Sequence, residues 1–159
     1  MAQYRLSRNL EASLIEFFRD ELVEDEWTGI SVMLNIKQDK VTLPAIIIYV
    51  LDTDVQKKEI GSGTFLKFPT VVIRIFANNE GQRLDLADWV LEKLECNIPY
   101  YSHIISSGGV STKTESGNVI ITKVIRNEKE YGNTNPENLE KEDRFRHNIT
   151  FSCYVGETS

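Results

Sequence analysis

The C-terminal part of the chain holds the strongest structural signal in the sequence. In DRFRHNITFSCYVGE, every second position from Phe145 to Val155 is apolar or, at His147, aromatic, and polar residues fill most positions between them. Successive side chains of a strand point to opposite faces, so this alternation predicts a strand with one buried face and one hydrated face. An isolated strand is not stable, so the rest of the chain must supply strands that pair with it.

Further segments rich in β-branched residues supply those partners. We predict strands at 31–36, 43–52, 64–77 and 118–126. The unbroken apolar run 45–51 predicts a central strand covered on both faces, with Pro44 at its entrance, where a missing amide does least harm. Pro69 predicts a bend or a bulge. The polar segment that ends in Gly-Ser-Gly predicts a protruding hairpin or strand extension.

Two amphipathic helices complete the predicted elements. The first covers 7–24 with Ser7 as its N-cap and ends in an acidic run, which is unfavourable beside the negative end of the helix dipole. This run is either a solvated face or a contact surface. The second covers 80–95, with Asn79 as N-cap and Trp89 flanking the buried face. Its predicted inward residues are Leu84, Ala87, Val90, Leu91 and Leu94.

These elements predict an α+β protein, an antiparallel or mixed β-sheet packed by two helices. Its 159 residues fit a single domain, 1–159, with exposed segments at 52–63 and 127–143. The second segment has almost no apolar residue, and it is too long for an ordinary hairpin turn, which predicts a functional or disordered loop. No apolar run approaches the roughly 20 residues of a membrane-spanning helix, and the N-terminus lacks a secretory signal, so we expect a soluble intracellular protein.

The sequence offers little catalytic chemistry. We predict no catalytic, cofactor or metal site, because neither the two histidines nor the two cysteines stand at a catalytic or metal-ligand spacing. His147 and Cys153 are predicted to be buried structural residues. If the protein is an enzyme or a ligand-binding domain, the least unfavourable site contains Cys96, Tyr100, Tyr101 and His103.

The order of elements resembles that of the tail terminator and tail-completion proteins of long-tailed bacteriophages. The resemblance covers 7–155 and rests on four stretches, namely NLEASLIEFFRDEL, LPAIIIYV, VVIRIFANNEGQRLDLADWVLEKL and RFRHNITFSCYV. It implies a non-enzymatic virion protein without a cofactor, assembled in the host cytoplasm and located at the tail–head junction. There a ring, usually of six subunits, caps the tail tube and contacts the head connector. Genomic DNA passes through the ring without specific binding.

The net charge is compatible with that role. The chain has 18 Lys and Arg against 24 Asp and Glu, a formal charge of −6, so six copies carry −36. Such a charge disfavours a grip on DNA, and acidic residues in a lumen would repel the phosphate backbone. Another neck or baseplate component is an alternative. The candidate partner contacts are Asp54, Gln56, Lys57, Lys58, Glu59, Glu128, Lys129, Glu130, Tyr131, Asn135 and Glu137.

Overall fold

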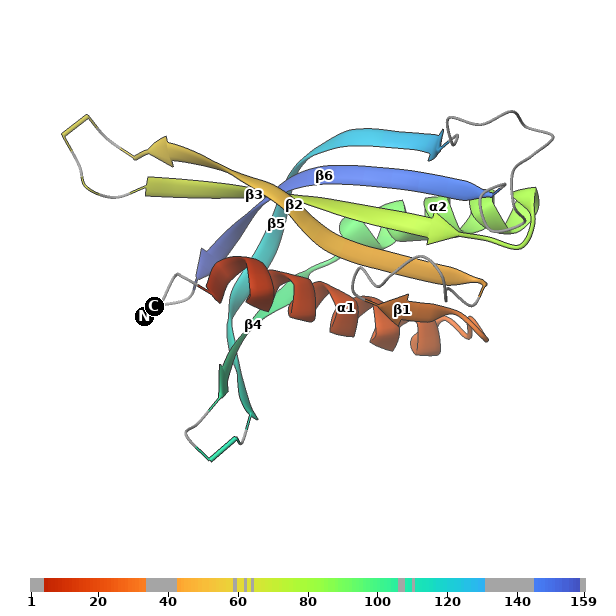
Figure 1. Cartoon of the computed structure of the whole chain (residues 1–159), viewed down its shortest axis with the longest axis horizontal. Coiled ribbons are helices and arrows are strands. Elements are labelled where there is room, and N and C mark those ends of the chain that lie inside the picture. The colour runs from red at the N-terminus through yellow and green to blue at the C-terminus, as the bar shows by residue number, and fades with distance from the viewer. Residues whose placement is uncertain are drawn as a thin grey trace.

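A computed structural model describes residues 5–33, 43–58, 60–61, 63, 65–105, 108–109, 111–130 and 145–157. Figure 1 shows its elements, which in chain order are α1 (Leu6–Glu24), β1 (Ser31–Met33), β2 (Ala45–Lys57), β3 (Phe65–Phe76), α2 (Glu80–Leu94), β4 (Ile98–Ile105), β5 (Ser111–Glu130) and β6 (Arg146–Glu157). The strands form one sheet in the order β1-β2-β3-β6-β5-β4, in which β1 and β2 are parallel and the other pairs antiparallel. The α+β class with a mixed sheet is therefore confirmed.

The sheet curls into a half-barrel, and the two helices cover its inner side. α1 contacts β1 and β2 near one edge of the sheet and β4 at the other, so it closes the open side of the half-barrel. α2 packs against β3 and β6 in the middle of the sheet. The β2–β3 and β4–β5 hairpins extend away from this body in different directions (Figure 1).

The hydrophobic core lies between the helices and the central strands. Leu14, Phe18, Ile48, Ile73 and Phe151 have no solvent exposure. Burial of one such side chain contributes roughly 1.5–3 kcal/mol to folding. The first four residues of β2, 45–48, are buried, which confirms a strand covered on both faces over that part of the predicted run. The rest of the run is not covered in this way: residues 49 and 50 are partly buried, and Leu51 is 58% exposed, so the prediction is wrong there.

Polar side chains of α1 form hydrogen bonds with backbone groups of the two outer strands of the sheet. The Ser13 hydroxyl accepts a hydrogen bond from the Tyr101 amide at 2.9 Å, and Asn9 Oδ1 accepts one from the His103 amide at 3.3 Å, both along β4. On β1, Arg19 donates from Nε at 3.0 Å and from Nη2 at 2.7 Å to a backbone carbonyl. Unpaired strand edges invite pairing with another chain, so α1 blocks strand addition at these positions.

The start of α1 differs from the prediction. The helix begins at Leu6, with Arg5 as N-cap and no side-chain cap, so Ser7 lies inside the first turn and the predicted cap is wrong. Leu6 packs against the core, and this contact favours an earlier start. An N-cap hydrogen bond is typically worth only about 1 kcal/mol, which the burial of one leucine can offset.

The buried stripe of α2 is shifted from the predicted one. Asn79 caps the helix as predicted, accepting a hydrogen bond from the Gln82 amide at 2.8 Å. Ala87, Val90, Leu94 and Trp89 are buried and Leu91 is partly buried. Leu84, predicted to face inward, is 48% exposed, and that prediction is wrong. Arg83 takes the inward position instead, because it reaches His147 on β6.

Several strands differ in length from their predictions, and β5 already begins at Ser111, before the predicted start at 118. β5 extends to Glu130, so 127–130 is strand and the prediction of a loop there is wrong. Although these residues are polar, they pair with the start of β6 in a regular antiparallel ladder. Residues 131–143 lie outside the described residues. β1 is described as strand over Ser31–Met33, and the predicted remainder, 34–36, is also outside them. The hairpin predicted between 52 and 63 is confirmed as an extension of β2 and β3.

Local details of β3 and β6 also differ. Pro69 pairs with Thr53 in a regular ladder, and the bulge lies on β2 between Val50 and Asp52. The predicted hydrated face of β6 is buried at two positions, Arg146 with 9% and Thr150 with 6% exposure. Arg146 lies over the Phe76 ring and pairs with Glu130, so these contacts remove it from water.

Candidate functional site

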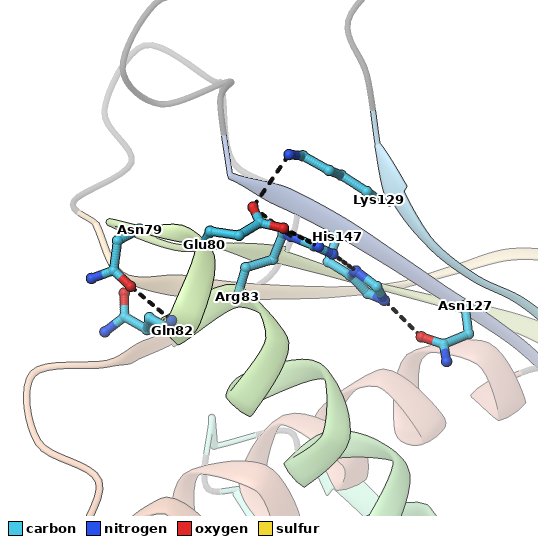
Figure 2. A network of polar contacts seen from close by, with 7 residues as sticks. All are labelled: Asn79, Glu80, Gln82, Arg83, Asn127, Lys129 and His147. Carbon is cyan, nitrogen blue, oxygen red and sulfur yellow. Dashed lines mark hydrogen bonds and ion pairs between the residues drawn. The ribbon is translucent and has the colours of Figure 1, made fainter.

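A polar cluster joins the start of α2 to the last two strands (Figure 2). Arg83 donates from Nη1 to His147 Nδ1 at 2.6 Å and forms an ion pair with Glu80 at 2.5 Å. His147 Nε2 lies 2.6 Å from Asn127 Oδ1 on β5. Lys129, also on β5, binds the same Glu80 carboxylate at 3.2 Å. The cluster therefore fastens the end of β5 to α2 across β6.

The partners of His147 fix its protonation state. Because Asn127 offers an oxygen, Nε2 carries the proton, and Nδ1 accepts from the Arg83 guanidinium. Burial, and then the charge of Arg83, lower the pKa of His147 below its ordinary 6.5. The Arg83 hydrogen bond, followed by Lys129, lowers the pKa of Glu80 to about 2. Both ring nitrogens are occupied, so this histidine is a structural residue, as the sequence predicted, and not an open catalytic base.

A second polar cluster joins the two helices. Lys93 of α2 binds Glu21 at 2.9 Å and Asp25 at 2.7 Å at the end of α1. Asp25 also accepts a hydrogen bond from the Trp89 indole at 2.8 Å. These bonds raise the pKa of Lys93 and lower that of Asp25. The acidic end of α1 is thus partly an intramolecular contact surface. The positive charge of Lys93 offsets the unfavourable position of these carboxylates beside the negative end of the α1 dipole.

The four residues of the least unfavourable enzyme site lie in different surroundings. Cys96 is exposed and lines a groove between the end of α2 and β5. Tyr100 is buried in the core. Tyr101 lies in a separate hollow of about 230 Å³, beneath the ammonium group of Lys113, which binds Glu16 of α1. The backbone of His103 is held by α1.

The described residues contain no group of three or more His, Cys, Asp or Glu that could hold a metal ion. Burial raises the pKa of the Cys153 thiol to about 12, so it is not a nucleophile near neutral pH. Cys153 is completely buried, as predicted from the alternation of β6.

The first group of predicted contact residues lies on the β2–β3 hairpin. Asp54, Gln56, Lys57 and Lys58 are all exposed there, and Gln56 donates to the Asp54 carboxylate at 2.8 Å. Glu59 lies outside the described residues. The predicted projection is thus present, and its polar side chains are open to solvent.

The second group is divided. Glu128 is exposed on β5, whereas Lys129 and Glu130 are partly buried in ion pairs: Lys129 binds α2, and Glu130 lies 3.6 Å from both Arg74 and Arg146. These two residues therefore fasten the strand within the chain. The remaining predicted contacts, Tyr131, Asn135 and Glu137, lie outside the described residues.

The sequence reasoning overlooked the exposed apolar side chains. Ten large ones are exposed among the described residues. Eight of them lie on the hairpins and the second half of β5, namely Leu51, Val55, Ile60, Phe65, Ile104, Ile120, Val124 and Ile125. The adjacent pairs at 120–121 and 124–125 were an available signal, because a strand with one hydrated face should alternate. Bulges after Ile121 and Val124 present these side chains in an irregular pattern.

Part of this apolar surface is hollowed. The α2–β5 groove, defined by Leu91, Leu94, Glu95, Cys96, Asn97 and residues 118–121 and 124, has a volume of about 670 Å³. Apolar side chains from α2 and β5 form most of its wall. Hollow apolar surfaces of this kind occur at contacts with other proteins and in ligand-binding grooves.

Comparison with known proteins assigns no relationship. No family model matches the sequence, and no curated protein matches it. Neither described helix has the length together with the apolar content needed to cross a membrane.

Proposed function

We propose that the protein is a structural component of a bacteriophage virion, a tail terminator. In this role it forms a ring, usually of six copies, that caps the tail tube and joins it to the head connector, with DNA passing through the centre. The same features suit a neighbouring neck component, which would use the same kind of ring.

One observation carries the proposal: eight of the ten large apolar side chains that are exposed among the described residues lie on the two hairpins and on β5. Four lie on the β2–β3 hairpin and three on β5, and the hairpin projects well beyond the body of the molecule (Figure 1). An enzyme places its catalytic and binding groups in a concave site. An assembly protein instead exposes apolar side chains on surfaces that contact neighbouring subunits. Projecting arms with apolar side chains fit a subunit that contacts several partners.

The rigid body supports the same role. α1 satisfies backbone groups of both outer strands, and the Arg83–His147 cluster ties β5 to α2. A ring subunit must hold its contact surfaces at fixed angles, because small errors in angle prevent closure. The formal charge of −6 per copy would help DNA to pass without adhering.

Deletion of the coding sequence from its phage genome tests the proposal. We expect heads and tails to accumulate separately, and electron microscopy of the lysate would show tails without a normal head-proximal end. Normal infectious particles from the deletion strain would refute the role.

Complementation then separates the assembly role from an enzymatic one. The deletion strain is complemented with the wild-type gene or with His103→Ala. Joining should be restored by both, because His103 has no part in assembly. Loss of joining with a folded His103→Ala protein would favour a catalytic or ligand-binding site at that position.

A further inference from the structure

We propose that the tip of the β2–β3 hairpin of one copy docks into the α2–β5 groove of a second copy. This inference rests on the proposed function, because it names the contact between neighbouring ring subunits. It concerns two surfaces of one chain that differ in shape and in charge.

The groove supplies the concave partner. Leu91 and Leu94 on α2 face Ile121 and Val124 on β5 across it. Val124, which lines the groove, is 40% exposed and leaves apolar surface open to solvent. Docking of an apolar group would remove this surface from water, which favours association.

The hairpin tip supplies the convex partner. Ile60 is fully exposed in the turn, and Val55 and Phe65 are about half exposed on the strands that lead to it. Gly61 adopts a positive φ of 87°, so the turn requires glycine there. The fully exposed isoleucine beside it leaves an apolar side chain open to contact with another chain.

The charges around the two surfaces are complementary. Lys57 and Lys58 are exposed next to the apolar tip, and Glu92 and Glu95 are exposed at the end of α2, where Glu95 lines the groove. Opposite charges around an apolar contact favour the correct register and speed association. The tip points away from the body that carries the groove (Figure 1), so the contact requires a second copy.

The geometry of this contact is head-to-tail. Tip and groove are different surfaces, so each copy can receive one neighbour and insert into another. A heterologous contact of this type forms a closed ring when its rotation closes. The contact is therefore able to build a ring without any second type of interface.

Disulfide trapping tests the contact, because Cys96 already lies in the groove and Cys153 is buried. In Ile60→Cys, mild oxidation should link the tip of each copy to the groove of the next. Non-reducing gels should then show a ladder of covalent dimers, trimers and larger species. The double variant Ile60→Cys/Cys96→Ser, which lacks the groove thiol, should stop at dimers.

Ile104→Cys is the matched control, since Ile104 is 55% exposed on the other hairpin. If Ile60→Cys forms no more covalent oligomer than this control, the docking is refuted. If the control forms larger oligomers than Ile60→Cys, the β4–β5 hairpin, and not the β2–β3 hairpin, lies nearer the groove of the neighbouring copy. Failure of the ladder while deletion still separates heads from tails would reject this contact and leave the tail role standing.

Discussion

Replacement of Arg83 by methionine tests the cluster that holds β5 to α2. Arg83 is 6% exposed, and its guanidinium donates to His147 Nδ1 at 2.6 Å. The variant loses a charged hydrogen bond, worth about 1.5–3 kcal/mol, and leaves a buried nitrogen without its donor. Methionine retains most of the volume and avoids burial of a cation, which offsets part of the loss. We expect the free energy of unfolding to fall by about 1–3 kcal/mol.

The pH dependence gives the same variant a second readout. The pKa of His147 is lowered in the folded protein, so the unfolded chain binds more protons as the pH falls below 6.5. Wild-type stability should therefore decrease from pH 6.5 downward until His147 itself is protonated. Each pKa unit of lowering corresponds to about 1.4 kcal/mol. In Arg83→Met the guanidinium charge is gone, so the pKa should rise and this decrease should become smaller.

Urea unfolding at pH 7.5 and pH 5.5, together with an NMR titration of His147, measures both effects. Arg8→Met is the matched control, because Arg8 is exposed on α1, and it should change stability by less than about 0.5 kcal/mol. An Arg83→Met protein with unchanged stability and an unchanged His147 titration would refute the assigned contact.

Three further predictions follow from the fold. Ser13→Ala should cost about 1–3 kcal/mol in urea unfolding, because it leaves a β4 amide without an acceptor; an unchanged midpoint would contradict this. Ellman's reagent should titrate Cys96 in the native protein and Cys153 only after unfolding, and two rapid native thiols would contradict the burial. Leu86→Ala should lower the free energy of unfolding by about 2–5 kcal/mol, because Leu86 is fully buried, and Leu84→Ala by less than about 0.5 kcal/mol. Equal losses would instead favour the buried helix face predicted from the sequence, which included Leu84.

The spacing of apolar residues predicted most of the fold, because the same spacing indicates both the type of element and the face that it buries. The alternation around Ile149 and the apolar run from Ala45 mark the central strands, and strands were found at both places. Asn79 was also found as a cap, since the capping hydrogen bond depends only on residues three positions apart. Local signals of this kind are readable without knowledge of the tertiary structure.

The errors arose where a distant residue decides the local structure. Arg83 faces inward because His147, 64 positions away, accepts its hydrogen bond. Residues 127–130 form a strand because the start of β6 pairs with them, although their composition resembles that of a loop. The α2–β5 groove could not be predicted, because it joins two elements whose packing only the tertiary structure shows.

The mass of the assembled protein tests the central claim most directly. Light scattering at increasing concentration, with electron microscopy of the same samples, measures whether the chain of 18.2 kDa closes into a ring. Six copies predict a limiting mass of about 109 kDa and images of a ring with a central opening. A mass that stays at 18.2 kDa at the highest concentration reached, with no rings in the images, would contradict the account.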